Sequence, residues 1–382
     1  MLITKIKLKN WRNFKDAEAP LRERVYIIGP NASGKSNLLD VMRFLRDIAK
    51  PDGGGFQKAV KDRGGVTKLR CLAARRDPEI MIALDVSLAA DADPVWRYTL
   101  KFKGKGLQRA VLTQERVENL TTGEFVIDRP NLEDTKDPDR LTQTALEQIS
   151  ENRAFRDLAD FFGSVTYLHL VPQLLKFADQ FGGFKLEADP FGQAFLERIA
   201  KTPKKFRDAR LRKIETALKA CVPNMEKLRY EPDERGVPHI EALYKHWRPD
   251  AGWQREDQFS DGTLRLLGIM WSLLDGDSLL LLEEPELSLN EAIVEKIHLL
   301  IWKMQREAKH RRQVFVSTHS EALLRDKSID PREIIRLEPS NNGTSVHTVT
   351  QEEAGLIDAG YSIAEIMLPK ARPQNFEQIF AV

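Results

Sequence analysis

Residues 29–36 read Gly29-Pro30-Asn31-Ala32-Ser33-Gly34-Lys35-Ser36. The apolar stretch Val25–Ile28 precedes them, and a helix is predicted to follow from Asn37 to Ile48. This is the G-x-x-x-x-G-K-[ST] pattern in the strand-to-helix context that its mechanism needs. The glycines let backbone N–H groups turn toward phosphates, and the start of the helix adds its positive dipole end. The stretch therefore predicts a phosphate-binding loop running from Gly29 into Asn37, with Lys35 on the β and γ oxygens and Ser36 on magnesium.

A second stretch ends a predicted strand in carboxylates. It reads Leu279-Leu280-Leu281-Leu282-Glu283-Glu284-Pro285-Glu286. Four leucines indicate burial, and open α/β sheets bind ligands at the carboxyl ends of their strands. We expect Glu283 to hold the metal, directly or through water, and Glu284 to orient and deprotonate the attacking water.

Two further motifs carry polar groups at element ends. Phe259–Thr263 opens an apolar-faced helix, so that Ser260, Gly262 and nearby N–H groups form an anion-binding N-terminus, although alone this would be an ordinary helix cap. His319 follows the buried strand predicted at 313–317, where it could contact the γ-phosphate or the attacking water. A single histidine is more often structural.

The remaining patterns predict an α/β protein with an antiparallel β subdomain and a helical insertion. An edge strand is expected at 2–9, a flexible loop at 128–139 and a buried strand at 165–171. A meander is expected from strands at 80–88, 95–102, 108–117 and 124–127. Helices are expected at 141–162, 191–221, 263–274 and 290–309, and a hairpin at 228–244. We divide the chain at 1–185, 186–250 and 251–382.

Composition excludes several classes of protein. The 59 lysines and arginines nearly balance 57 aspartates and glutamates, so no global field indicates a nucleic-acid or membrane partner. The longest apolar stretch, 278–282, is too short for a membrane span, and the N-terminus lacks a signal peptide. Cys71 and Cys221 lack metal-ligand spacing and are expected to be small buried side chains. A cytoplasmic protein is expected.

Together, the four motifs in this order resemble the ABC-type P-loop ATPases of the SMC, RecF and OLD group, over most of the chain outside the insertion. The resemblance implies the following roles: Gly29–Ser36 as Walker A, Phe259–Thr263 as the signature, Leu279–Glu284 as Walker B, Leu287–Asn290 as the D-loop and His319 as the switch histidine. It also implies that Gln173 is the Q-loop glutamine, a magnesium ligand, and that Asn13, within Asn10–Phe14, lies near the nucleotide.

Two departures from the group's commonest patterns matter. Glu283 stands where aspartate is usual in Walker B, which leaves the magnesium geometry open. The signature reads Phe-Ser-Asp-Gly-Thr rather than Leu-Ser-Gly-Gly-Gln, which argues against a transporter subunit. By the same resemblance, the signature of one subunit closes on the ATP held by the other. That implies a homodimer with two composite ATP sites and leaves a higher oligomer open.

Three functions remain open at this stage. The favoured one is the ATPase of an anti-phage defence system that controls a separate effector, such as a nuclease or toxin, because only 63 residues follow His319, too few for a TOPRIM nuclease domain. The second is a RecF-like repair ATPase binding DNA through the basic run 201–213, although such runs are more often solvated helix faces. The lysines at 5, 7, 9, 101, 103 and 105 are expected to protect sheet edges. The third is a non-hydrolytic scaffold, which the presence of Glu284 disfavours.

Overall fold

The computed structural model describes residues 1–106, 109–177, 191–192, 194–248, 252–307 and 311–371. Two compact units make up the chain. The first unit comprises residues 1–166, 278–281 and 312–382, and the second comprises residues 167–277 and 282–311. The boundaries predicted at 185/186 and 250/251 lie outside the described residues.

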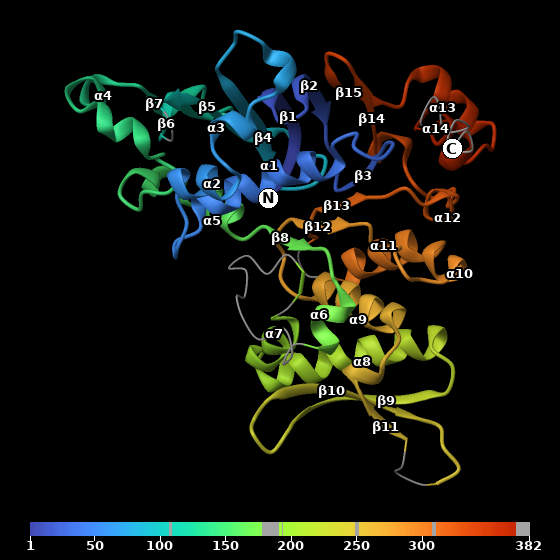
Figure 1. Ribbon diagram of the computed structural model, residues 1–382. Coiled ribbons are helices and arrows are strands. Elements are labelled where there is room, and N and C mark those ends of the chain that lie inside the picture. The colour runs from blue at the N-terminus through green and yellow to red at the C-terminus, as the bar shows by residue number, and fades with distance from the viewer. Residues whose placement is uncertain (107–108, 178–190, 193, 249–251, 308–310, 372–382) are drawn as a thin grey trace, which may run out of the picture. The chain divides into compact units, whose positions relative to one another are not determined.

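The first unit contains a six-stranded antiparallel sheet in the order β2-β1-β4-β5-β6-β7 (Figure 1). Its strands are β1 (Leu2–Trp11), β2 (Phe14–Pro20), β4 (Ile80–Ser87), β5 (Pro94–Lys105), β6 (Arg109–Asn119) and β7 (Glu124–Arg129). The last four form the predicted meander, which is confirmed. Alternating apolar residues of these strands supply the buried face, because successive side chains of a strand point to opposite faces.

β1 is an interior strand, so the prediction of an edge strand at 2–9 is wrong. A tight turn pairs Trp11 with Phe14 and folds β2 back along one side of β1, while β4 pairs along the other. Lys5 and Lys7 contact Glu18 across the β1–β2 pair. β5 pairs with β6 along its length but with β4 only as far as Phe102, so Lys101 lies between two strands, whereas Lys103 and Lys105 lie beyond the end of β4.

A second six-stranded sheet has the order β15-β14-β3-β13-β12-β8. β3 (Arg24–Ile28) pairs in parallel with β13 (Val314–Ser317) and β14 (Ile334–Ser340), and β15 (Gly343–Thr348) is antiparallel to β14. β12 (Leu280–Glu283) and β8 (Thr166–Leu168) begin in the first unit and end in the second. β8 is much shorter than the strand predicted at 165–171.

Helices of the first unit pack beside these sheets. α1 (Lys35–Ala49) contacts α2 (Phe56–Asp62) and α5 (Arg156–Gly163), and α3 (Val66–Leu69) contacts β5. An aromatic cluster of the side chains of Trp11, Phe44, Phe56 and Phe102 fills the space between α1, α2 and the antiparallel sheet. All four rings are fully buried. The C-terminal part adds α12 (Glu321–Leu324), α13 (Gln351–Asp358) and α14 (Ile363–Met367).

Segment 128–139 is ordered, contrary to the expectation of a flexible loop. It contains α4 (Leu132–Lys136), whose N-cap Asn131 accepts hydrogen bonds from two backbone N–H groups. The buried guanidinium of Arg129 pairs with Asp134 at 2.7 Å and with Glu115 of β6 at 3.3 Å. These buried charge pairs fix a segment whose composition resembles a solvated loop.

The helix predicted at 141–162 is also only partly correct, since α5 begins at Arg156. Residues before it form turns and a short 3-10 helix (Glu151–Phe155). The Glu115 carboxylate accepts hydrogen bonds from the backbone N–H groups of Ala145 and Leu146, at 2.7 and 3.2 Å. The side chain of Glu115 thus binds two backbone N–H groups that would donate to carbonyl oxygens within the helix if the helix were continuous.

The second unit is largely helical and carries a three-stranded sheet in the order β11-β10-β9 (Figure 1). Its elements are α6 (Pro172–Lys176), α7 (Phe195–Lys201), α8 (Lys204–Cys221), β9 (Met225–Pro232), β10 (Pro238–Tyr244), β11 (Trp253–Arg255), α9 (Asp261–Leu274), α10 (Glu291–Val294) and α11 (Ile297–Glu307). The β9–β10 hairpin agrees with the prediction. The helix predicted at 290–309 is divided into α10 and α11. No helix in the part of the chain that the structure describes is long and apolar enough to cross a membrane.

Candidate nucleotide site

The predicted phosphate-binding loop connects β3 to α1, which begins at Lys35. Gly34 has a φ of 101°, a left-handed backbone that favours glycine. A Cβ atom at this position would lie 2.1 Å from Nδ2 of Asn13. Residue 34 therefore needs glycine for both its backbone angle and the space beside it.

Lys35 is almost fully buried, with 7% of its surface exposed, and folds back over the loop. Its Nζ donates hydrogen bonds to the carbonyl oxygens of Gly29 and Pro30, at 3.0 and 3.2 Å. The Nδ1 atom of His319 lies 3.5 Å from the same Nζ. The structure thus brings together two predicted site residues that are 284 positions apart in the sequence. An ammonium group held against a loop in this way is placed to receive an anion.

Asn13 is fastened directly to the backbone of the loop. Its Nδ2 donates to the carbonyl oxygen of Ser33 at 2.7 Å and to Oγ1 of Thr344 at 2.6 Å, and its Oδ1 accepts from Asn37 at 2.9 Å. Oγ1 of Thr344 in turn donates to the Ser33 carbonyl at 2.9 Å. Sequence reasoning missed Thr344, since nothing in its surroundings marks it.

The start of α1 is anchored by the turn between β1 and β2. The Trp11 indole donates to the carbonyl oxygen of Asn37 at 2.9 Å, and Arg12 pairs with Asp40 at 3.1 Å. Burial alone would raise the pKa of Asp40, but the guanidinium of Arg63 outweighs it and holds that pKa below its ordinary value. Asp40 is therefore ionised at neutral pH and joins the helix to the turn that carries Asn13.

Glu283 and Glu284 belong to the second unit. The Glu283 carboxylate accepts a hydrogen bond from the hydroxyl of Tyr167, and Nδ1 of His169 lies 3.3 Å from the Glu283 carbonyl oxygen. Glu284 has a φ of 44°, an uncommon left-handed angle for a residue other than glycine. Such backbone strain concentrates at functional sites. Sequence reasoning did not predict a role for Tyr167 or His169, although both lie within the strand predicted at 165–171.

The predicted signature caps α9. Ser260 is its N-cap residue, and its Oγ accepts from the N–H of Thr263 at 3.1 Å. A Cβ atom on Gly262 would lie 2.7 Å from the carbonyl oxygen of Ser288 in the predicted D-loop, so glycine permits this close approach. Asp261 accepts from Gln173 and pairs with Lys176, each at 2.7 Å. The amide nitrogen of Gln173 thus holds the signature helix, while its role as a magnesium ligand stays a prediction.

Comparison with known proteins bears on the fold and on the kind of site. A family model described as "AAA domain, putative AbiEii toxin, Type IV TA system" matches residues 25–325. The chain belongs to this AAA-domain family. A second model, the P-loop containing region of an AAA domain, matches residues 3–45 of this AAA-family chain. No curated protein is significantly similar to it.

Solved structures similar to this AAA-family chain include heads of SMC proteins. One is an SmcHead bound to the C-winged helix domain of ScpA, which is 16% identical to this chain with a TM-score of 0.59. The match covers 93% of this chain and 100% of the SmcHead chain. Another is an SMC head domain from Thermotoga maritima, which is 16% identical with a TM-score of 0.47. That match covers 92% of this chain and 100% of the Thermotoga chain. The first likeness confirms the predicted fold class, and the family matches confirm a P-loop domain of the AAA kind.

The oxygen donors of this AAA domain suit a magnesium nucleotide. The hydroxyl of Ser36, which follows Lys35 at the start of α1, is a hard donor of the kind Mg²⁺ prefers, and Mg²⁺ takes few protein ligands when phosphates supply the rest. Oγ of Ser33 is fully buried in the loop and has no hydrogen-bond partner. Within the described ranges, no three His, Cys, Asp or Glu side chains gather into a metal cluster. The hydroxyl donor of Ser36 beside the loop therefore fits magnesium that arrives with a nucleotide.

Arg265 of α9 is a buried cation that the sequence analysis did not identify. Only 6% of its surface is exposed, and its Nε has no hydrogen-bond partner. Burial lowers the pKa of its guanidinium, against the opposing effect of the carboxylates of Asp261, Glu286 and Glu284. The buried charge of Arg265 therefore adds positive potential around Glu284.

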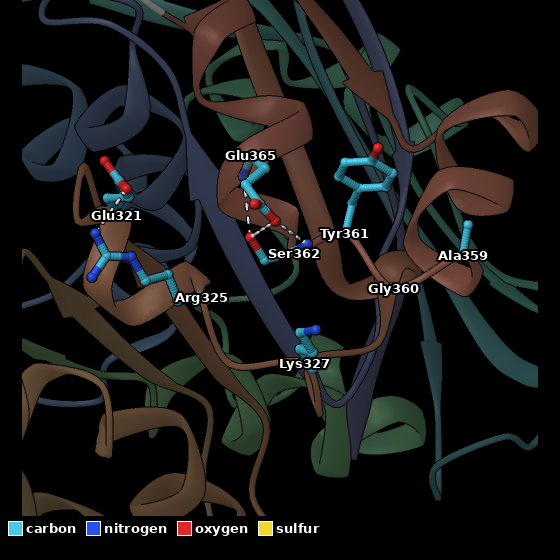
Figure 2. A pocket seen from close by; sticks show the side chains of 8 residues that line it. All are labelled: Glu321, Arg325, Lys327, Ala359, Gly360, Tyr361, Ser362 and Glu365. Carbon is cyan, nitrogen blue, oxygen red and sulfur yellow. Dashed lines mark hydrogen bonds and ion pairs between the residues drawn. The ribbon is translucent and has the colours of Figure 1, made fainter.

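A separate cavity of about 530 Å³ lies in the first unit between α12 and the segment that leads into α14. Figure 2 shows Arg325 turned toward Glu321, 2.9 Å apart, on one side, and Ser362 bonded to Glu365 on the other. The lining mixes both signs of charge and contains none of the predicted site residues. α12 nevertheless begins directly after His319 and its N-cap Ser320.

Proposed function

We propose that this AAA-family chain binds ATP with Mg²⁺ and hydrolyses it. The observation that carries the proposal is the position of Lys35, buried at the start of α1 and held on the loop carbonyls beside His319. The phosphates of ATP would accept hydrogen bonds that the Lys35 ammonium now gives to the carbonyl oxygens of Gly29 and Pro30. Magnesium, bound with the nucleotide, would offset charge on the phosphate oxygens.

The chain's own residues take distinct roles in this proposal. Backbone N–H groups of the loop and Lys35 bind the phosphates, while Ser36 and Glu283 hold the metal. Glu284, whose backbone is left-handed, orients the attacking water and accepts its proton. His319 hydrogen-bonds the γ-phosphate or the attacking water. Asn13 and Thr344 keep the loop in shape through the Ser33 carbonyl.

We further propose that two copies form a homodimer with composite ATP sites. The 14-residue helix α9 begins at Ser260 and offers N–H groups and a positive dipole end to an anion. In the dimer, Ser260 and Gly262 of one copy bind the γ-phosphate of ATP held by the other. The pairing of Asp261 with Gln173 and Lys176 supports this role, because it links the signature helix to the predicted Q-loop.

For the biological role, we propose a nucleotide-gated regulator of a separate effector in a defence system. The family description, with its putative toxin and type IV toxin–antitoxin system, supports a two-component arrangement of this kind. A second candidate is a nucleic-acid-stimulated ATPase, because one surface of the second unit is strongly basic. A scaffold with negligible turnover is the remaining alternative.

The test is ATP turnover and solution mass of purified protein, measured for the wild type and Glu284→Gln. We expect wild-type turnover that requires magnesium, and a Glu284→Gln variant that shifts from monomer to dimer mass on addition of ATP. Turnover that is absent in the wild type would leave the scaffold as the better function. A mass that never changes with ATP in either protein would contradict the composite site.

A further inference from the structure

Segment 198–213 of the second unit concentrates positive charge to a degree that the whole chain does not. It contains eight lysines and arginines and a single carboxylate, Asp208, whereas the complete chain carries a net charge of only +2. The segment covers most of α7 and the first half of α8. A concentration of this kind creates a local field even where the protein is close to neutral overall.

A groove of about 350 Å³ lies within this segment, and we call it the α7–α8 groove. It is lined by Arg198, Lys201, Thr202, Pro203, Phe206, Arg210 and Asp275. Asp275 pairs with Arg198 at 3.1 Å and with Arg210 at 2.7 Å. The two guanidinium groups are thereby held in fixed positions while each retains further N–H donors.

Three lysines beside the groove are left to solvent. Lys201, Lys204 and Lys205 are exposed, and the described residues offer their side chains no ion pair or hydrogen bond. Two of them begin α8, which has no side-chain cap and no acidic residue in its first turn. Helix starts normally favour negative side chains, because the N-terminus carries a partial positive charge. Lysines in this position raise the positive potential further, which is unfavourable for the chain alone and favourable for a bound anion.

Phe206 gives the groove an aromatic side chain, 59% exposed among the cations. The buried side chains of α8 are Leu211, Ile214 and Leu218, none of which lines the groove. One exposed ring is too little apolar surface for insertion into a lipid bilayer, where amphipathic helices present a whole apolar face. A ring beside lysines and arginines instead suits a nucleic-acid strand, in which phosphates alternate with bases that stack on aromatic groups.

We propose that the α7–α8 groove binds single-stranded nucleic acid. Lys201, Lys204 and Lys205 neutralise consecutive backbone phosphates, and Phe206 stacks against a base. This inference deepens the second candidate function above by assigning a groove and a class of strand to the basic surface. It does not rest on ATP binding, since every residue that carries it belongs to the second unit and none belongs to the predicted nucleotide site.

The experiment is fluorescence anisotropy of the full chain, without nucleotide, with a labelled DNA strand of about 20 nucleotides, and with its duplex, over a range of salt. The charge variant is Lys201→Gln/Lys204→Gln/Lys205→Gln. Its matched control is Lys101→Gln/Lys103→Gln/Lys105→Gln on β5, which removes the same charge from the first unit. Thermal melting establishes that both variants fold like the wild type.

We expect the charge variant to lose about tenfold in affinity for the single strand, and the slope of log K against log salt to fall by about two, because three phosphate contacts at about 0.7 each are removed. Phe206→Ala should lower the affinity for the single strand by about tenfold and leave the affinity for the duplex nearly unchanged, since paired bases cannot stack on the ring. The β5 control should match the wild type.

Three results would overturn the proposal. They are equal losses in the charge variant and the β5 control, a Phe206→Ala variant that binds the single strand as the wild type does, and a wild type that binds anionic lipid vesicles but not DNA at low salt. These binding measurements are made without nucleotide. If the proposed ATP hydrolysis proved wrong, the results for nucleic-acid binding would therefore be unaffected.

Discussion

The side chain of Asn13 and the carbonyl oxygen of Ser33 are joined by a hydrogen bond of 2.7 Å. The same amide nitrogen also reaches Thr344, so one residue of the β1–β2 turn ties the phosphate-binding loop to β15. The shape of the loop is therefore set from outside the motif.

Asn13→Ala should weaken nucleotide binding without removing it. The substitution deletes hydrogen bonds that hold the loop, and bonds of this kind contribute about 1 kcal/mol each, so we expect about a tenfold rise in the dissociation constant for ATP, measured by calorimetry. The matched control is Asn131→Ala, which removes the α4 cap. It should cost about 1 kcal/mol of stability and leave ATP binding unchanged. Equal affinities for Asn13→Ala and wild type would contradict the role of the Asn13 bond.

Lys35→Ala should abolish detectable nucleotide binding. The loop would lose the only ammonium group of the motif, which is almost fully buried where it can meet the phosphates. A fluorescent ATP analogue measures the loss. Lys58→Ala on α2 is the control, since Lys58 forms an exposed pair with Asp62 and lies outside the motif. Nucleotide binding by Lys35→Ala within a few-fold of wild type would remove Lys35 from its proposed role.

Glu284→Gln should retain ATP binding while hydrolysis falls by at least about a hundredfold, because an amide cannot take the proton of the attacking water. ATP should then accumulate in the dimer, visible as a doubled mass in light scattering. Glu226→Gln, an exposed glutamate on β9, is the control. Normal turnover by Glu284→Gln would show that another group acts as the base.

Backbone geometry at Glu284 gives a separate prediction about stability. With a φ of 44°, the residue is in a region that asparagine tolerates and that β-branched residues resist. Glu284→Val should therefore destabilise the protein by about 1 kcal/mol or more relative to Glu284→Asn, as measured by urea unfolding. Equal stabilities would indicate that the left-handed angle relaxes when the side chain changes.

Stability should decrease as pH rises from about 5 to 7. Burial raises the pKa of Glu115 to about 7, against the lowering effect of the Ala145 and Leu146 N–H groups and of Arg129. In this interval the folded protein holds a proton that the unfolded chain, with an ordinary carboxyl pKa, has released. A group with a raised pKa in the folded state therefore loses stability as pH increases. Burial likewise raises the pKa of Glu333 to about 7.

Glu115→Gln should flatten part of this dependence when the melting temperature is followed against pH, because the amide cannot ionise. The pH dependence that remains in the Glu115→Gln variant should include the contribution of Glu333. The exposed residue Glu124 provides the control variant Glu124→Gln, which should keep the wild-type slope. A Glu115→Gln profile parallel to that of the wild type would contradict the raised pKa.

Local patterns predicted the elements whose partners are close in sequence. The meander from β4 to β7, the hairpin of β9 and β10, and the strand–loop–helix around Lys35 each follow from periodicity and turn residues. Patterns failed where a distant side chain decides the local structure. Glu115 holds the backbone N–H groups of Ala145 and Leu146, where the helix predicted at 141–162 does not form, and Arg129 orders the segment expected to be a loop. From sequence alone, a charged residue is predicted to be exposed to solvent, and only the fold shows whether a distant residue pairs with it in the interior.

The candidate site shows the same division. The motifs predicted the loop, the signature and the acidic pair, because each needs specific residue types at fixed spacing. Thr344, Tyr167 and Arg265 carry no such spacing, and only the fold relates them to Ser33, Glu283 and Glu284. Glycine at 34 was expected from the motif, but its second reason, the proximity of Asn13, required the structure.

The bond between Thr344 and Ser33 joins residues 311 positions apart, and β3 lies between β13 and β14, which are also distant in sequence. On the ribosome, the loop therefore emerges long before the residues that hold it. Strand β3 cannot pair with β13 and β14 until residues 314–340 have been synthesised. Competence to bind nucleotide should arise only late in synthesis, so a truncated polypeptide released before residue 344 would carry the complete motif and still lack a formed site.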